Sequence, residues 1–227
     1  MPSPRKEPYL WTTWLPRLLV GDYSCEWAVW FKAHHQYAKV PNTRDWTTFR
    51  IAHTEMLAQK RKELEAEGYR VFTEGQGEFR LRGKTATLHG RPDLVAVSPS
   101  RALVCEIKST TPPYPAHRAQ TQLYMYALGQ AVKARGGGPA YELVKEARGR
   151  AFDGLIVYQD HPAVEVPATT IDKTFVDSLG LLIRRLSDPL PAHKVPSLRE
   201  CGFCDIPLAE CPDRQAAEII EGETDDF

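Results

Sequence analysis

Short aliphatic runs alternate with longer amphipathic stretches along this chain, and the alternation predicts a sheet flanked by helices. Strand-like runs lie near 70–82, 85–97, 102–108, 151–158 and 163–166. Helical patterns lie near 25–31, 45–67, 116–134 and 172–186. Residues 1–21, rich in Pro and Trp, are expected to form an irregular arm. Strands interleaved with helices are typical of an α/β fold.

The clearest local pattern is a β-hairpin in the middle of the chain. Two aliphatic runs, 94–97 and 102–104, flank a Ser-Pro-Ser turn. Side chains alternate between the two faces of a strand, so Glu106 and Lys108 point the same way. Asp93, at the start of the first strand, can lie beside Glu106 across the hairpin.

This arrangement of Asp93, Glu106 and Lys108 predicts a metal-dependent phosphodiesterase site. Two neighbouring carboxylates attract a hard divalent cation such as Mg²⁺ or Mn²⁺. The ammonium group of Lys108 can orient an attacking water, and the carbonyl of Ile107 is a plausible further metal ligand. An edge strand with an exposed Glu–Lys pair would show part of the same pattern, but the Asp in the preceding strand favours the catalytic interpretation.

Cysteines form a second constellation. Cys201, Cys204 and Cys211 have the Cys-x2-Cys-x6-Cys spacing of a metal knuckle, and Cys25 is the natural fourth ligand. Cys105, in the middle of a strand, is expected to be a buried structural thiol. No secretory signal is recognisable, so a cytoplasmic location is expected, where disulfides are rare and clustered cysteines indicate metal. Spacing alone does not separate zinc from an iron–sulfur cluster.

Composition fits one globular domain. The chain has 227 residues, of which 42% are hydrophobic and 26% charged. We expect a single domain over 1–212 and an acidic, disordered tail over 213–227. No apolar run is long enough for a bilayer, so no membrane partner is expected. The formal net charge is +0, and a DNA-binding surface would therefore need local clusters of Lys and Arg.

The order of the motifs resembles that of the RecB-like iron–sulfur nucleases, and most closely the CRISPR-associated fourth Cas family. A lone Cys is followed by Asp…Glu-x-Lys, by Gln-x3-Tyr and by three further Cys. Gln122 and Tyr126 resemble the Gln-x3-Tyr motif, and we expect Gln122 to bind the metal-bound water or a phosphate. Tyr126 fits contact with a base or sugar as well as it fits the core. His53 resembles the helical histidine that serves as a further metal ligand.

The resemblance implies a restriction-endonuclease-like PD-(D/E)xK core, a mixed β-sheet flanked by helices. It implies a [4Fe-4S] cluster held by Cys25, Cys201, Cys204 and Cys211, which joins the N- and C-terminal segments. The implied activity is that of a DNA exonuclease on single-stranded ends, in CRISPR spacer acquisition or in recombination and repair, with CRISPR integrase proteins as possible partners. A non-catalytic DNA-end or partner-binding module is the alternative. The sequence leaves the oligomeric state open.

Overall fold

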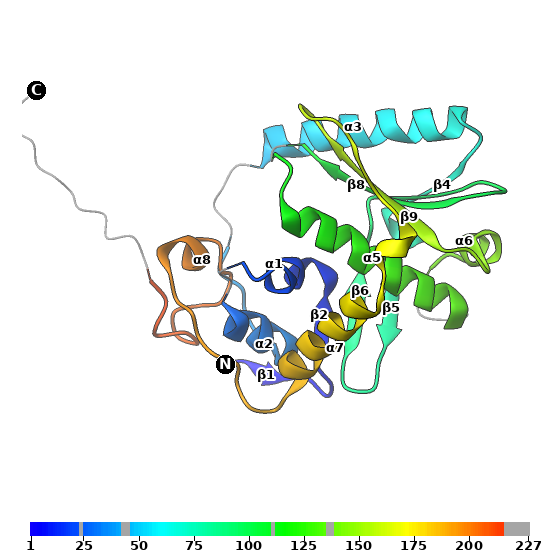
Figure 1. Ribbon diagram of the computed structural model, residues 1–227. Helices are drawn as coiled ribbons and strands as arrows, with labels where there is room; N and C mark the ends of the chain where they lie inside the picture. The colour runs from blue at the N-terminus through cyan, green and yellow to red at the C-terminus, as the bar shows by residue number, and fades with distance from the viewer. Residues whose placement is uncertain (23–24, 42–45, 110–111, 135–138, 216–227) are drawn as a thin grey trace, which may run out of the picture.

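A mixed five-stranded β-sheet forms the centre of the computed structural model, which describes residues 1–22, 25–41, 46–109, 112–134 and 139–215 (Figure 1). Its strand order is β10-β9-β8-β7-β4. Only β8 and β9 run parallel, whereas the other three pairs are antiparallel. The strands are β4 (Arg70–Thr73), β7 (Leu94–Val97), β8 (Ala102–Lys108), β9 (Phe152–Tyr158) and β10 (Val164–Val166). The predicted α/β fold with a mixed sheet is confirmed.

Two long helices cover opposite faces of this sheet (Figure 1). Helix α3 (Thr47–Ala66) packs through Leu64 on the face that carries Cys105. Helix α5 (Pro115–Ala134) packs on the other face, where Val104 lies. Both helices were expected from the sequence to within two residues at each described end. Since β8 is buried along nearly its whole length, its polar residues must be satisfied by neighbouring side chains.

Helix α5 approaches the sheet closely at Gly154 in β9. A Cβ atom at this position would lie 2.4 Å from Thr121 and 2.9 Å from Met125. A larger residue would therefore push α5 away from the sheet. This glycine sets the distance at which side chains of α5 meet those of β8 and β9.

A second sheet of three strands corrects three expectations. It has the order β2-β6-β5, formed by β2 (Tyr9–Trp11), β6 (Thr87–Gly90) and β5 (Phe79–Arg82). The N-terminal arm is therefore not irregular, because β2 pairs in parallel with β6 and Leu10 is fully buried. The runs near 70–82 and 85–97 are each two strands that belong to different sheets. They are interrupted by α4 (Glu74–Gly77) and by the Arg91-Pro92 step.

The N- and C-terminal segments pack against each other on one side of the molecule (Figure 1). Helix α2 (Glu26–His34) lies against α7 (Lys173–Ser187), and the backbone N–H of Trp27 donates to the carbonyl of His193 at 3.1 Å. Trp30 Nε1 donates to the carbonyl of Asp188 at 2.7 Å. These contacts join the two segments through protein groups alone, and the cluster expected to join them stays a prediction.

The remaining elements are short. They are β1 (Ser3–Pro4), which pairs with β3 (His35–Gln36), and η1 (Thr12–Trp14), α1 (Pro16–Leu19), α6 (Tyr141–Ala147), η2 (Ala168–Thr170) and α8 (Leu198–Gly202). Most of the expected acidic tail lies outside the described residues. Within the part of the chain that the structure describes, no helix is both long and apolar enough to cross a bilayer.

Candidate active site

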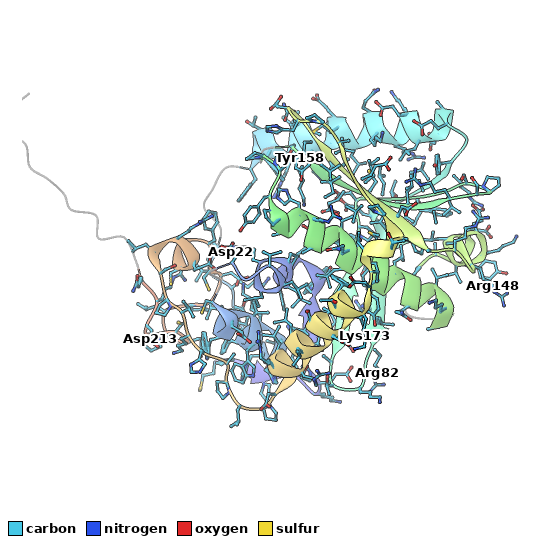
Figure 2. The ribbon with its side chains drawn as sticks, viewed as in Figure 1. Asp22, Arg82, Arg148, Tyr158, Lys173 and Asp213 are labelled. Carbon is cyan, nitrogen blue, oxygen red and sulfur yellow. The ribbon has the colours of Figure 1, made fainter. Side chains whose placement is uncertain are left out.

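The β7–β8 hairpin brings the predicted carboxylates together. Leu94 pairs with Cys105, and this register sets Asp93 opposite Glu106, as expected. Figure 2 labels Tyr158, which pairs with Lys108 across the parallel strands and so marks the same end of the sheet. The candidate site therefore lies where β8 and β9 end and α5 begins.

Glu106, Lys108 and Gln120 form a closed triangle of polar contacts. Lys108 Nζ donates to Glu106 Oε1 and to Gln120 Oε1, both at 3.0 Å. Gln120 Nε2 completes the triangle with a 2.7 Å hydrogen bond to Glu106 Oε1. Glu106 is 4% exposed, so these bonds are largely shielded from water and hold the lysine in one place.

The second oxygen of Glu106 is available for a ligand. Glu106 Oε2 is buried and has no hydrogen-bond partner among the described residues, and the same is true of Ser109 Oγ. Burial, and then the charge of Asp93, raise the pKa of Glu106 to about 7. A bound cation would reverse both effects, because it would compensate the buried charge and occupy the free oxygen. The donor set thus fits a hard divalent cation such as Mg²⁺ or Mn²⁺.

Asp93 connects the hairpin to helix α3. Its Oδ2 accepts a 2.7 Å hydrogen bond from the backbone N–H of Ile107 and lies 3.4 Å from His53 Nε2. The hydrogen bond to Asp93 raises the pKa of His53. The structure thus places His53 beside Asp93, and its role as a metal ligand stays a prediction. The role of the Ile107 carbonyl as a ligand stays a prediction.

The side chains of His53, Asp93 and Glu106 are not arranged around a common metal position in this structure. Among the residues that the structure describes, no group of three or more His, Cys, Asp or Glu side chains is arranged to hold a metal ion. His53 Nε2 contacts Asp93, and the Lys108 ammonium group pairs with Glu106, so each carboxylate already has a neighbouring side chain as a partner. A metal ion would replace the imidazole–carboxylate contact by coordination.

The Gln-x3-Tyr motif lies in a different register from the one expected. Gln122 Nε2 donates to the carbonyl of Thr170 at 3.3 Å, and Tyr126 packs on Phe175 with ring centroids 6.4 Å apart. Gln120, two residues earlier, contacts Glu106 instead. Successive helical residues are rotated by about 100°, so residues 120 and 122 point in nearly opposite directions.

Tyr124 completes the alternative register that sequence reasoning missed. It is 2% exposed, and Gln120 Nε2 lies 3.4 Å from its hydroxyl oxygen. Burial raises its pKa. The sequence Gln-Thr-Gln-Leu-Tyr-Met-Tyr (120–126) fits the motif from residue 120 as well as from residue 122. The signal that separates the two registers is the buried stripe of α5, which includes Ala116, Leu123 and Ala127.

His117 is a further residue that the sequence did not single out. Its Nδ1 lies 3.2 Å from the hydroxyl of Tyr158. Burial, and then the charge of Lys108, lower its pKa to about 4, so the imidazole is neutral at physiological pH. Cys105 is fully buried on the opposite face of β8, as predicted, and burial raises the pKa of its thiol.

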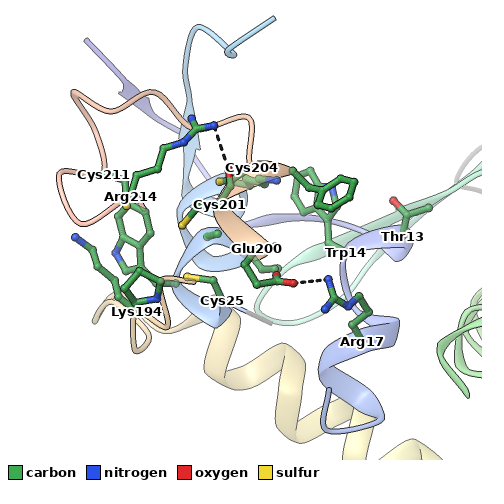
Figure 3. A pocket seen from close by; sticks show the side chains of 16 residues that line it. Thr13, Trp14, Arg17, Cys25, Lys194, Glu200, Cys201, Cys204, Cys211 and Arg214 are labelled. Carbon is green, nitrogen blue, oxygen red and sulfur yellow. Dashed lines mark hydrogen bonds and ion pairs between the residues drawn. The ribbon is translucent and has the colours of Figure 1, made fainter. Parts of the chain in front are cut away.

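The four other cysteines line one cavity of about 200 Å³ (Figure 3). All four are free thiols, supplied by the start of α2, by α8 and by the loop after α8. Burial is the main cause of the raised pKa of Cys204 and of Cys211. Lys194 and Arg214 line the same cavity, and the backbone N–H of Val195 lies 3.5 Å from Cys25 Sγ. Thiols are soft donors that suit zinc or an iron–sulfur cluster rather than a hard ion, but among the described residues these four are not arranged to hold a metal ion.

Salt bridges anchor the cysteine loop to the N-terminal segment. Asp205, which follows Cys204, accepts from Lys32 Nζ at 2.9 Å and from the Tyr37 hydroxyl at 2.8 Å. The backbone N–H of Val40 donates to the Asp205 carbonyl at 2.8 Å. Cys25 and the C-terminal cysteines are thus held near each other by contacts that need no metal.

A half-buried Asp and a buried Glu lie beside a lysine at the end of a hairpin in a mixed sheet, and their oxygens are of the kind that bind a divalent cation. A sequence model of the PD-(D/E)XK nuclease superfamily matches residues 24–208, and the protein belongs to this superfamily. Its members typically use divalent metals such as Mg²⁺ or Mn²⁺ to cleave nucleic acids. No curated protein matches the chain in sequence.

The crystal structure of SSO0001 is similar in fold. The superposition has a TM-score of 0.51 and 17% sequence identity, and it covers 93% of this chain and 89% of that chain. At this identity the similarity concerns the fold alone.

Proposed function

We propose that the protein is a divalent-metal-dependent deoxyribonuclease that acts on DNA ends, mainly single-stranded, as an exonuclease. The observation that carries the proposal is the triangle of contacts that Lys108 and Gln120 make with the buried Glu106, beside Asp93. Buried polar atoms of a purely structural salt bridge are usually satisfied, whereas Glu106 Oε2 is buried and has no hydrogen-bond partner among the described residues. An intact set of acid, base and amide groups also argues against the alternative of a non-catalytic DNA-end module.

Each residue has a defined task in this proposal. Asp93, Glu106 and His53 would hold the cation, which supplies an activated water and offsets the charge that builds on the phosphate. Lys108 holds its ammonium group between Glu106 and Gln120, 3.0 Å from each, and can orient the attacking water. The neutral His117 imidazole adds no competing positive charge beside Lys108.

An iron–sulfur cluster bound by Cys25, Cys201, Cys204 and Cys211 is the second part of the proposal. Its support is the shared cavity, together with the neighbouring cations Lys194 and Arg214 that would balance a negative cluster (Figure 3). Such a cluster would be structural, because it would tie α2 to the segment after α7. The motif order further suggests a role in CRISPR spacer acquisition or DNA repair.

Cleavage of an end-labelled single strand in Mn²⁺ tests the nuclease. We expect the wild type to shorten the strand progressively and Lys108→Ala to leave it intact while binding it equally well. Lys133→Ala is the matched control, since Lys133 is an exposed lysine near the other end of α5. Intact substrate with a folded wild-type protein would favour the non-catalytic module.

Absorption spectroscopy of anaerobically purified protein tests the cluster. We expect a brown protein with broad visible absorption and about four iron atoms per chain. A colourless protein with one bound zinc would show that the four thiols form a zinc site instead.

A further inference from the structure

An aromatic stripe at the start of α3 leads to the candidate active site. The ring centroids of Trp46 and Phe49 are 5.6 Å apart, and those of Phe49 and His53 are 5.9 Å apart. His53 Nε2 in turn lies 3.4 Å from Asp93 Oδ2. These aromatic residues recur at the i, i+3 and i+7 positions, so they share one face of the helix.

This stripe is not part of the hydrophobic core. Trp46 and Phe49 are half-buried and belong to neither of the two core clusters, although α3 contributes Leu64, Met56 and Leu57 to one of them. Half-buried aromatic side chains outside the core keep part of their ring faces within reach of a ligand. Their continuity with His53 places those faces directly beside the reacting groups.

A basic side chain accompanies the aromatic rings. Arg50 lies one turn after Trp46 on the same face and is exposed. No ion pair of Arg50 with another described residue is found in the structure. Ile51, next to it, is 55% exposed and adds apolar surface. Aromatic rings interleaved with an exposed cation match a strand that offers flat bases and a phosphate backbone.

We propose that Trp46 and Phe49 form a stacking platform for the unpaired bases of single-stranded DNA, with Arg50 on a phosphate, next to the scissile bond. The proposal deepens the proposed function by naming the part of the protein that selects single strands. Bases in an intact duplex already stack on each other and do not offer their faces. The platform therefore favours single strands or frayed ends over blunt duplexes.

Binding of fluorescein-labelled oligothymidylate, without added divalent metal, tests the platform. Stacking of one base contributes about 1–3 kcal/mol, so Trp46→Ala is expected to raise Kd about 5- to 150-fold. Trp46→Phe keeps a ring and is expected to change Kd less than threefold. Tyr141→Ala is the matched control, because Tyr141 is an exposed aromatic (76%) on α6, and it is expected to bind like the wild type.

An abasic strand of the same length separates stacking from charge. We expect the wild type and Trp46→Ala to bind it equally, because no base is present to stack. The platform would be refuted if the wild type and Trp46→Ala bound oligothymidylate with equal affinity. It would also be refuted if Trp46→Ala lost as much affinity for the abasic strand as for oligothymidylate. Where thermal unfolding shows that Trp46→Ala does not fold, Trp46→Leu decides the question, since leucine is apolar but offers no ring.

Cleavage in Mn²⁺ distinguishes failure of the platform from failure of the nuclease. Wild-type cleavage with no effect of Trp46 substitution would leave the nuclease standing and refute the platform. Binding that depends on Trp46, without any cleavage by the wild type, would support the platform and refute the nuclease. With both correct, Trp46→Ala raises KM for single strands and leaves kcat nearly unchanged.

Discussion

Replacing Gln120 by alanine is the sharpest perturbation of the candidate site, because it separates the two possible registers of Gln-x3-Tyr. The Gln120 amide makes two hydrogen bonds to charged groups: it donates to Glu106 at 2.7 Å and accepts from Lys108 at 3.0 Å. Gln122 makes a single 3.3 Å bond to the carbonyl of Thr170. The matched control is thus Gln122→Ala on the same helix.

The expected size follows from these contacts. A hydrogen bond to a charged group contributes about 1.5–3 kcal/mol. Removal of Gln120 leaves Lys108 bound only to Glu106 and free to swing away. If most of one such bond is lost in the transition state, about 2–3 kcal/mol, then kcat/KM falls about 30- to 150-fold. Gln122→Ala loses one neutral bond outside the site and is expected to stay within about threefold of the wild type.

Single-turnover cleavage of an end-labelled single strand in Mn²⁺ measures this difference. Thermal unfolding of each variant shows whether a loss of rate reflects a loss of fold. Wild-type rates for Gln120→Ala, or a larger loss for Gln122→Ala, would refute the assignment of the motif to residue 120.

Three further predictions concern charge and stability. Lys108→Ala abolishes cleavage but keeps the affinity for Mn²⁺, measured by calorimetry, because both carboxylates remain. Without metal, the free energy of unfolding of the wild type falls by about 3 kcal/mol more than that of Glu106→Gln when the pH rises from 4.5 to 7. The reason is that folding raises the pKa of Glu106 to about 7. Cys201→Ala lowers Tm, because the loss of a cluster ligand would remove one cross-link between α2 and the C-terminal segment.

The sign of the pH effect follows from the buried carboxylate. Its pKa is higher in the folded protein than in the unfolded chain, so the protonated form is favoured by folding. The contribution of Glu106 to folding stability is fully present below its pKa in the unfolded chain, and it is lost as the pH rises through its pKa in the folded protein. Denaturant titrations of both proteins at several pH values check this, and parallel curves would contradict it. Likewise, unchanged manganese affinity in Glu106→Ala would contradict the ligand role, and an unchanged Tm in a colourless Cys201→Ala would contradict the structural cluster.

Local patterns could be predicted from the sequence, and distant pairings could not. The β7–β8 hairpin was expected correctly because its turn and both strands lie within fifteen residues. The pairing of Leu10 with Leu88 was missed because a parallel partner so far along the chain leaves no periodic signal. The splitting of the run near 70–82 between two sheets was missed for the same reason.

The candidate site shows the same division. Strand alternation fixes the face on which each side chain lies, so the placement of Asp93, Glu106 and Lys108 near one another could be predicted. The choice between Gln120 and Gln122 needed the rotation of α5 on the sheet, and tertiary packing sets that rotation. Gly154 illustrates this, since its missing side chain lets α5 approach β9.

Contacts between the N-terminal segment and the C-terminal segment determine which parts of the protein can fold first during synthesis. Trp30 reaches its hydrogen-bond acceptor at residue 188, and Tyr37 reaches Asp205. A nascent chain therefore carries Trp30 without its hydrogen-bond acceptor until 158 further residues have been made. The β-sheet can form first, while closure around the cysteines must come last, so chains that terminate early expose α2 to aggregation and to proteases.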